Sequence, residues 1–319
     1  MFNKLLNNLL KDNQVFAPVK SGENFNIREI SQAAEVDYSG KITANSWKNI
    51  FLPAREILFN FKKDQINKPT ILKKPVVAWG MNVLDLRALG LWELVFSKDI
   101  YFQERRKNIL VVGLSVGAPT EFKDWQIFSH NLEENILEHL PFDIFLEKQT
   151  NNQFKIYTSS DKGEEVLEQN KITDYQHLEF SGLIPEEGPD KKMLNLMESM
   201  KQSKVSEKVW QELGRICIAC GKCSIVCPTC FCFDIYDEAA GKDEAQRIRA
   251  WGNCFYPEFS KICEGKIFLD TIAKKIYFWY EHKFLRIPME YKIPGCVSCL
   301  RCNQVCPVGI KIEETLKKL

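Results

Sequence analysis

Cysteine is the residue type in this chain whose spacing points most directly to chemistry. One pattern occurs twice: three cysteines separated by two residues each, then a fourth after three intervening residues, followed by proline. The eight residues are Cys217, Cys220, Cys223 and Cys227 in the first run and Cys296, Cys299, Cys302 and Cys306 in the second. This is the ligand spacing of paired 4Fe-4S clusters, in which the fourth cysteine of each run serves the other cluster.

The spacing predicts two ligand sets, each drawn from both runs. Cluster 1 would be bound by Cys217, Cys220, Cys223 and Cys306. Cluster 2 would be bound by Cys296, Cys299, Cys302 and Cys227. Since each set takes one ligand from the other run, two regions far apart in the sequence would be held together by iron.

Two other uses of cysteine explain this pattern less well. Zinc sites use separated Cys-x2-Cys pairs, often completed by histidine, and need neither a third cysteine two residues later nor a proline after the fourth. Disulfide frameworks belong to small secreted domains, whereas all 12 cysteines of this 319-residue chain lie beyond residue 216. Because the whole pattern occurs twice, a 4Fe-4S protein is the favoured interpretation.

Four cysteines lie outside the two runs, and four is the number that a third cluster would need. They are Cys230, Cys232, Cys254 and Cys263. The alternative is that they are buried thiols packed near the clusters, since free cysteine is among the most buried residue types. We favour this alternative, because a Cys-x-Cys pair is tight for a cube. We therefore predict two clusters, with Cys230, Cys232 and Cys254 as the best candidates for any additional site.

Length and charge place the chain in a broad class. A chain of 319 residues exceeds what one hydrophobic core normally organises, so we expect two domains. The formal net charge of +1 and the pI near 7.4, without a basic stripe of interleaved aromatic residues, do not favour nucleic acid or an anionic membrane as a partner. We expect no signal peptide and no membrane span, because no apolar run is long enough. A cytoplasmic location is expected, since a reducing interior preserves thiolates and clusters.

The first part of the chain is predicted to be a mixture of α and β structure. Pro75–Met81 and Asn108–Ser115 are short apolar runs typical of buried strands, and Phe154–Ser160 alternates like a half-exposed strand. Between the first two, Leu84–Phe96 places apolar residues at helical intervals. The order strand, helix, strand indicates a parallel pairing. The segment Gly113–Gly117 lacks the full glycine pattern of a phosphate-binding loop, so a nucleotide site of that type is not predicted.

A domain boundary is predicted near residue 190. Ser181–Lys192 is rich in glycine, proline and charge, which is typical of an exposed linker. We expect an α/β domain over residues 1–190 and a second domain over residues 191–319. Met193–Ile216 is predicted to be a helix that leads to the first cysteine run, with its methionine row packed in the core.

The separation of the two cysteine runs favours helices in the second domain. Small bacterial ferredoxins join their runs by a much shorter segment. Here residues 228–295 contain Asp237–Trp251, which has strong helix formers, and Leu269–Leu285, which is amphipathic and aromatic. The arrangement resembles the all-helical two-cluster ferredoxin domain of heterodisulfide and fumarate reductase subunits, and the helical fold is implied by that resemblance.

A closer resemblance covers most of the chain. The segment CIACGKCSIVCPTCFCFD at Cys217–Asp234, Trp251-x2-Cys254, His282-Lys283-Phe284 and the final run CVSCLRCNQVCPVGIKI resemble two families, the β subunits of cytosolic sulfhydrogenases and the iron-sulfur subunits of anaerobic sulfite reductases. Three amino-terminal segments agree more loosely: Val15–Pro18, Leu52–Glu56 and Asp85–Leu89.

The resemblance implies an electron-transfer role. In both families such proteins pass single electrons between two other subunits, one that binds a flavin and NAD(P)H and one that holds the catalytic metal. The catalytic partner would be a nickel-iron hydrogenase or a sirohaem sulfite reductase. The hydrogenase is slightly preferred, because of the wording of Cys230–Asp234 and of Pro307–Ile310.

The amino-terminal domain departs from the family pattern. In the family, a cysteine precedes the aspartate that corresponds to Asp85, and a Cys-x-Cys pair follows the second strand. This chain has Leu84 at the first place and no cysteine in Ser115–Phe128. The domain is therefore expected to be a degenerate docking scaffold.

Apart from the cysteines, few residues suggest chemistry. Arg215, Lys222 and Arg301 lie beside the cysteine runs and could raise the potential of a cluster, although each alone is more simply a solvated surface residue. His282 lies in an aromatic helical stretch that is more typical of a packed histidine than of a ligand. No catalytic triad, Walker loop or zinc-hydrolase motif is present, so nothing argues for independent catalysis.

A function of another class stays open. The clusters could hold together an interaction or redox-sensor protein whose amino-terminal domain does the binding. A sensor would bind its partner differently in its oxidised, reduced and cluster-free states, whereas a relay would exchange electrons without changing its own composition.

Overall fold

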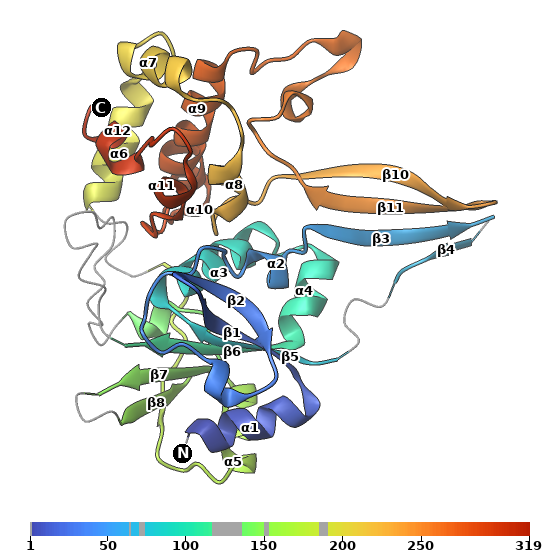
Figure 1. The fold of residues 1–319 in the computed structure, drawn as a ribbon, viewed down its shortest axis with the longest axis vertical. Helices are drawn as coiled ribbons and strands as arrows, with labels where there is room; N and C mark the ends of the chain where they lie inside the picture. Colours follow the sequence, from blue (N-terminus) through green and yellow to red (C-terminus); the bar gives the residue numbers. More distant parts are fainter. Residues whose placement is uncertain (1, 64, 70–73, 117–135, 150–152, 185–190) are drawn as a thin grey trace. The chain divides into compact units, whose positions relative to one another are not determined.

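The computed structural model describes residues 2–63, 65–69, 74–116, 136–149, 153–184 and 191–319 (Figure 1). These residues form two compact units. Unit 1 contains the described residues of 1–47 and 72–190, together with Val297–Cys299. Unit 2 contains the described residues of 48–71, 191–296 and 300–319. Residues 48–71 thus group with the carboxyl-terminal part of the chain, and the expected domain limits, 1–190 and 191–319, stay a prediction about independently folding parts.

Unit 1 is built on a seven-stranded sheet with the order β2-β1-β5-β6-β7-β8-β9. The strands are β1 (Gln14–Ser21), β2 (Asn24–Ile30), β5 (Val76–Met81), β6 (Ile109–Ser115), β7 (Ile144–Lys148), β8 (Phe154–Thr158) and β9 (Gln176–His177). β1, β5, β6 and β7 are parallel, and β2 and β8 are antiparallel to their neighbours. The predicted strands at β5, β6 and β8 and the parallel pairing of the first two are confirmed.

Helices accompany the strands of this sheet. They are α1 (Phe2–Asp12), α3 (Val83–Val95), α4 (Ile100–Lys107) and α5 (Asp161–Gln169), with short 3-10 turns η1 (Ala33–Glu35) and η3 (Leu137–His139). α3 confirms the predicted helix, and it begins where the Asn82 side chain accepts a hydrogen bond from the Asp85 amide at 2.9 Å. The α/β class predicted for this region is confirmed.

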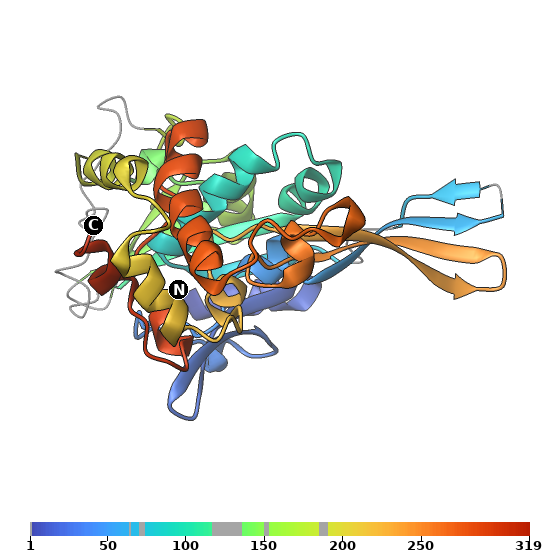
Figure 2. The ribbon, with the colours of Figure 1, turned by 90° about the horizontal axis from the view of Figure 1, so that it is seen from above.

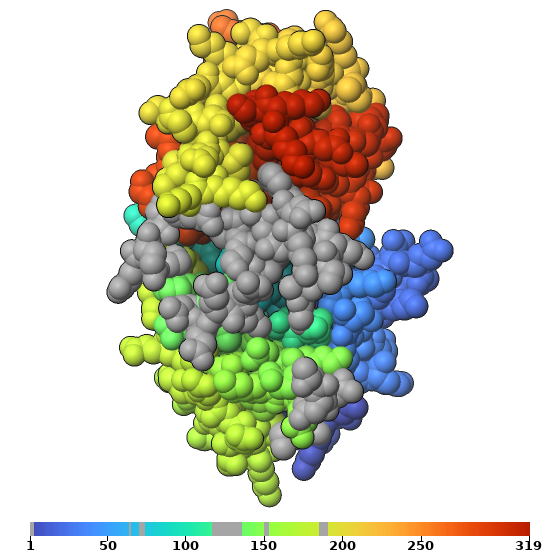
Figure 3. Space-filling view, turned by 90° about the vertical axis from the view of Figure 1, so that its left-hand side faces the viewer, coloured from blue at the N-terminus to red at the C-terminus, as the bar shows by residue number. Residues whose placement is uncertain are grey.

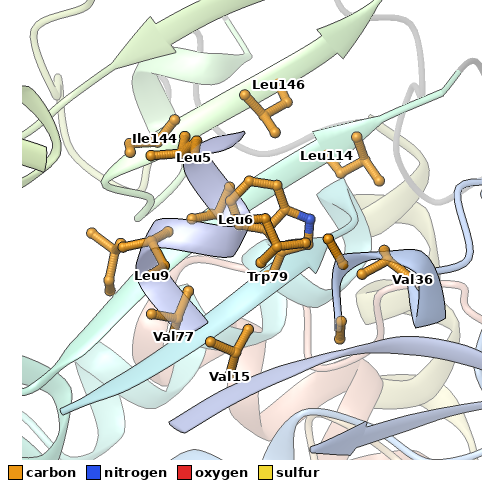
Figure 4. Packing of buried hydrophobic residues seen from close by; sticks show 14 of the residues in the cluster. Leu5, Leu6, Leu9, Val15, Val36, Val77, Trp79, Leu114, Ile144 and Leu146 are labelled. Atoms are coloured by element: carbon orange, nitrogen blue, oxygen red, sulfur yellow. The ribbon is translucent and has the colours of Figure 1, made fainter. Parts of the chain in front are cut away.

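The core of unit 1 is aliphatic and aromatic. Figure 4 shows Leu5, Leu6 and Leu9 of α1 packed against Trp79 and other side chains of the sheet. Leu6 and Trp79 are fully buried. All of the buried residues of this cluster belong to unit 1, and none is a cysteine.

Unit 2 is mostly helical. Its helices are α2 (Lys48–Phe51), α6 (Lys191–Gln202), α7 (Lys208–Ile216), α8 (Lys222–Val226), α9 (Ile272–Glu281), α10 (Ile287–Tyr291), α11 (Arg301–Val305) and α12 (Ile312–Leu316), with 3-10 turns η4 (Pro257–Ser260) and η5 (Cys263–Gly265) and a π-helix η6 (His282–Arg286). The predicted helix over Leu269–Leu285 is confirmed by α9 and η6. The predicted helix Met193–Ile216 is divided into α6 and α7, and of its methionines Met193 and Met200 are buried.

Close packing of α7 on α9 organises this unit. A Cβ added at Gly214 would lie only 2.8 Å from the Cβ of Ala273, so glycine allows the two helices to touch. The fully buried Trp210 packs edge to face on Tyr277, with a ring-centroid distance of 5.5 Å. In Figure 3 the carboxyl-terminal residues, in dark red, lie beside the yellow α6, and both line a polar hollow that includes Gln202 and Leu319.

The prediction of a helix over Asp237–Trp251 is wrong. β10 (Phe233–Gly241) and β11 (Glu244–Trp251) form an antiparallel hairpin instead. β11 also pairs with β3 (Arg55–Lys62), which pairs with β4 (Gln65–Asn67), to give the sheet order β10-β11-β3-β4. Figures 1 and 2 show these blue and orange strands side by side. The helix propensity of the segment is overridden because a strand from a distant part of the chain supplies its hydrogen-bond partners. The second region is therefore mostly helical rather than all-helical.

Two predicted segments fall largely or partly outside the described residues. Of Ser115–Phe128, only Ser115 and Val116 are described, and of the linker Ser181–Lys192, residues 185–190 are not. Across the described ranges of the chain, no helix has the length and apolar character needed to cross a membrane.

Candidate metal centre

A cavity in unit 2 brings cysteines of the two runs together. Five of the eight motif cysteines line it: Cys217, Cys220, Cys223, Cys302 and Cys306. The four predicted ligands of cluster 1 are among them, including Cys306 from the second run. Much of the remaining lining is apolar and comes from α9 and the loops around it, with Phe255, Ile276, Trp279 and Tyr280. The cavity therefore combines soft thiol ligands with a wall that excludes water.

One buried polar group beside this cavity has no partner in the protein. Trp279 lines the cavity, and its indole Nε1 is buried without a hydrogen-bond partner among the described residues. A buried N-H group left unpaired costs free energy. A cluster carries anionic sulfur, which accepts hydrogen bonds, so an unpaired donor and five thiols around one cavity fit a 4Fe-4S group.

The two cysteine loops have the same unusual backbone. In the first run Ala219 and Gly221 have φ values of 52° and 71°. At the matching places of the second run Ser298 and Leu300 have φ values of 58° and 54°. Left-handed backbone is strained for residues other than glycine and persists where the surroundings require it. Such turns direct backbone N-H groups toward anions, and the Ala219 amide donates to Cys217 Sγ at 3.3 Å.

A buried asparagine holds the first loop in place. The Asn253 Nδ2 donates to the Gly221 carbonyl at 2.9 Å, and its Oδ1 accepts from the Phe255 amide at 3.0 Å. A Cβ at Gly221 would lie 2.2 Å from Asn253 Nδ2. Glycine is therefore required twice at this position, by the left-handed backbone and by the close approach of Asn253.

Cys227 lies in a second, fully buried polar network. The Lys283 Nζ donates to Cys227 Sγ at 3.1 Å, to Thr229 Oγ1 at 3.0 Å and to the Gly295 carbonyl at 3.2 Å. A hydrogen bond with Cys230 holds the pKa of Cys227 well below its usual range, and the Lys283 ammonium acts in the same direction against the effect of burial. The same hydrogen bond raises the pKa of Cys230 well above its usual range. Cys227 is therefore the thiolate of this pair and Cys230 the thiol.

A second buried lysine lies near the same sulfur atoms. Lys48 is 3% exposed, donates to the Ser224 carbonyl at 3.2 Å and lies 4.1 Å from the ring centroid of Trp251. Burial lowers its pKa, while Cys230 and Cys227 act in the opposite direction. Neither Lys48 nor Lys283 was singled out from the sequence as a site residue. The only signal for Lys283 was its place in the His282-Lys283-Phe284 segment.

The basic residues expected beside the runs differ in their surroundings. Arg215 and Lys222 are exposed, as solvated surface residues are. Arg301 is fully buried at the start of α11, so the interpretation of this residue as surface is wrong. His282 packs between Phe231 and Phe278, at ring-centroid distances of 5.6 and 5.8 Å.

The four additional cysteines do not gather at one place. Cys254 is buried, with its Sγ 3.7 Å from Ser224 Oγ, and burial raises its pKa to about 12. Cys230 and Cys232 are partly buried, and Cys263 is exposed on η5. Within the described parts of the chain, no three His, Cys, Asp or Glu side chains are arranged as the ligands of a metal ion.

Unit 1 has a cavity of its own at the carboxyl ends of β5 and β6. Its lining includes Asp37, Thr43, Asn82, Leu84 and Ser115. Leu84, which stands where the family pattern has cysteine, is 4% exposed. This lining offers oxygen and amide groups but no thiol, so it does not suit an iron-sulfur cluster.

Comparison with known proteins identifies the cysteine-rich region. The family model of the 4Fe-4S dicluster domain matches residues 216–310. The whole chain is 26% identical over 333 aligned residues to the sulfhydrogenase 2 subunit beta of Pyrococcus furiosus, and the match covers 100% of this chain and 96% of that protein. No solved structure matches. The two cysteine runs, the cavity that gathers them and the family match agree, and residues 216–310 of this chain are a 4Fe-4S dicluster domain with two 4Fe-4S clusters as its cofactors.

Proposed function

We propose that this protein relays single electrons between two other subunits, one that binds a flavin and NAD(P)H and one that holds a catalytic metal. Its dicluster domain and its likeness to a hydrogenase β subunit support an iron-sulfur electron-transfer role. A 4Fe-4S cluster, when bound, accepts and donates one electron without a change in its ligands. Among the catalytic partners expected from the sequence, the sulfhydrogenase relative favours a hydrogenase over a sulfite reductase.

The observation that carries this proposal is the cavity shared by the two cysteine runs. Cys306 lines it together with Cys217, Cys220 and Cys223, although about 80 residues separate it from them in the sequence. We assign these four residues to cluster 1. By the same exchange, Cys227 with Cys296, Cys299 and Cys302 is assigned to cluster 2.

The surrounding side chains have defined tasks in such a relay. Phe255, Ile276, Trp279 and Tyr280 exclude water from the cluster 1 cavity. Burial raises the pKa of Tyr280 well above its usual range, so its phenol stays neutral beside the thiolates. Lys48 and Lys283 place positive charge near Cys227, where a cluster gains negative charge on reduction. Such a protein is expected in the reducing cytoplasm.

The relay is tested by anaerobic purification of the full chain with whatever proteins accompany it. We expect about eight iron and about eight sulfide per chain and a flavoprotein and a hydrogenase protein in the same complex. The clusters should be reduced when NADH or NADPH is added to the complex. A sulfite reductase as the partner would overturn the choice of hydrogenase. Partner binding that depends on the redox state, without reduction by NADH or NADPH, would favour the sensor instead.

The ligand assignment is tested separately with Cys227→Ser. We expect this variant to lose about four iron and to keep the paramagnetic signal of cluster 1, because its own run supplies three ligands to the retained cluster. Cys230→Ser is the matched control three residues away, and it should keep about eight iron. A Cys227→Ser protein with both clusters would show the assignment to be wrong.

A further inference from the structure

Lys283 is a buried cation that contacts both cysteine runs. Only 2% of its surface is exposed. Its acceptors come from two regions: Cys227 Sγ and Thr229 Oγ1 belong to the end of the first run, while the Gly295 carbonyl immediately precedes Cys296 of the second. The contact with Gly295 is reciprocal, because the Gly295 amide donates to the Lys283 carbonyl at 3.2 Å. Lys283 thus fixes the end of one run to the beginning of the other.

The geometry around its nitrogen indicates an ammonium group. An ammonium has three hydrogens and no acceptor, and three acceptors lie 3.0 to 3.2 Å from the Nζ. Of these three, only the Cys227 sulfur can carry a negative charge. A buried charge is tolerated when a group of opposite charge accompanies it. The pair therefore consists of the Lys283 ammonium and the Cys227 thiolate.

Neighbouring groups keep this arrangement rigid. The Thr229 hydroxyl donates to the Gly295 carbonyl at 2.7 Å, which leaves its oxygen to accept from Lys283. A Cβ at Gly295 would lie 2.6 Å from the Lys283 carbonyl, so the two backbones approach as closely as glycine permits. The ammonium also lies 5.1 Å from the ring centroid of Trp279, which borders the cluster 1 cavity.

The π-turn explains why a lysine faces the interior here. Three pairs of buried neighbours follow one another at intervals of four residues: Trp279 and Tyr280, Lys283 and Phe284, Ile287 and Pro288. In an α-helix each step of four residues would rotate the buried face by about 40°. The wider π-turn at His282–Arg286 absorbs this rotation, and Pro288 lacks the N-H that would continue the α-helical pattern. Functional sites are frequent at such turns.

We propose that Lys283 positions Cys227 as a ligand of cluster 2 and raises the reduction potential of that cluster. Lys283 has this role only if Cys227 is a ligand, as proposed above. Reduction adds one negative charge to the cluster, and a fixed positive charge beside a ligand sulfur stabilises the reduced form more than the oxidised form. A hydrogen bond to the ligand sulfur acts in the same direction. The effect should fall on cluster 2 and leave cluster 1 unchanged.

The test is a redox titration of the full chain, monitored by electron paramagnetic resonance, for wild type, Lys283→Met and Lys274→Met. Methionine keeps the length of the side chain but removes the charge and the donors. Lys274 is the matched control, because it lies on α9 and pairs with the exposed Asp270 at 2.8 Å. The signal that Cys227→Ser removes identifies cluster 2.

In Lys283→Met we expect the ratio of reduced to oxidised cluster 2, measured at a fixed potential, to fall at least about tenfold, which is about 59 mV for a one-electron couple. Cluster 1 should titrate as in wild type, and Lys274→Met should change neither cluster. A protein with both clusters bound and no shift in cluster 2, or with equal shifts in both, would overturn the role of Lys283.

A second variant covers the case in which Lys283→Met does not assemble cluster 2. Thr229→Val removes one acceptor of the ammonium and one neighbour of Cys227 but leaves the charge. A smaller shift of cluster 2 in the same direction is expected, and an unchanged potential would count against the proposal. If Cys227→Ser keeps both clusters, the ligand assignment itself fails. If it loses one cluster and the Lys283 and Thr229 variants shift nothing, only the role of Lys283 fails.

Discussion

At the scale of single residues, the cysteines differ more in their surroundings than in their spacing. Cys217 accepts a hydrogen bond from the Ala219 amide, while Cys227 accepts one from a buried ammonium. Burial raises the pKa of Cys223 to about 12, whereas the contacts of Cys227 hold its pKa well below the usual range. One ligand run thus contains a thiol that resists ionisation and a thiolate that is formed in advance. The loop that carries them depends on glycine at one position.

Gly221→Ala is expected to damage the first cysteine loop. The left-handed backbone costs alanine about 1–2 kcal/mol, and its Cβ would also displace the Asn253 amide. Gly265→Ala is a matched control, since Gly265 has a similar φ of 77° but open space around its Cβ position. We expect Gly221→Ala to lose iron and to unfold at a lower urea concentration than Gly265→Ala. Equal effects of the two substitutions would show that the contact with Asn253 is unimportant.

His282 should make stability depend on pH. Burial, with the nearby Lys283 and Arg286 charges, lowers the pKa of His282 to about 4 in the folded protein, against about 6.5 in the unfolded chain. Because the unfolded state binds this proton more tightly, the stability contributed by neutral His282 is complete above about pH 6.5 and is lost as the pH falls toward about 4. Between about pH 7.5 and about pH 5 the loss is about 2 kcal/mol.

This dependence is measured by urea unfolding at the two pH values. His282→Phe, which keeps an aromatic ring between Phe231 and Phe278, should remove about 2 kcal/mol of the difference. His177→Gln is the control, since His177 is half-exposed and lies in unit 1. An unaltered pH dependence in His282→Phe would contradict the buried neutral state of His282.

At the scale of elements, the sheet β10-β11-β3-β4 has its own buried ion pair. The Arg249 Nε and Nη2 both donate to Glu56 Oε2, at 3.0 and 2.5 Å, and both side chains are less than 10% exposed. The pair joins β11 to β3, two strands that are almost 200 residues apart in the sequence. The Arg249 guanidinium also lies 5.6 Å from the ring centroid of Phe233 on β10. Electrostatics and aromatic contact therefore support the hairpin where helix propensity would oppose it.

Glu56→Gln is expected to destabilise this sheet by about 3 kcal/mol, because the Arg249 charge would remain buried without its carboxylate partner. Asp237→Asn is the control in the same sheet, since Asp237 pairs with Arg247 in exposed positions and should have little effect. Hydrogen exchange of the β3, β10 and β11 amides would measure the difference. Similar exchange in the two variants would mean that the buried pair contributes no more than the exposed one.

At the scale of the whole molecule, the two units are held together internally by different means. The core of unit 1 consists of side chains such as Leu6, Trp79 and Ile144, which need no cofactor. In unit 2 a cavity lined by cysteines lies among α7, α8, α9 and α11, where a smaller domain would have an apolar core. Where metal ligands replace a core, the free energy of metal binding becomes free energy of folding.

Removal of iron with a chelator and an oxidant should therefore affect the units unequally. We expect amide protection to fall in α9 and α11 of unit 2 and to persist in β5 and β6 of unit 1. Hydrogen exchange followed by mass spectrometry, before and after iron removal, measures both units in one sample. Simultaneous loss of protection in both would show that unit 1 also depends on the clusters.

The sequence by itself determined the cofactors, because the ligand spacing of a 4Fe-4S run is a local property that a few consecutive residues express. The strands β5 and β6 and the helix α3 were also predictable, since their apolar periodicity is local. Only the tertiary structure revealed Lys283 beside Cys227, since burial of a lysine depends on contacts between residues 56 positions apart. It alone decided that Asp237–Trp251 belongs to a hairpin, because the partner strand β3 comes from residues 55–62. Local spacing specifies which groups bind iron, while contacts across the chain decide which charges and which strands lie beside them.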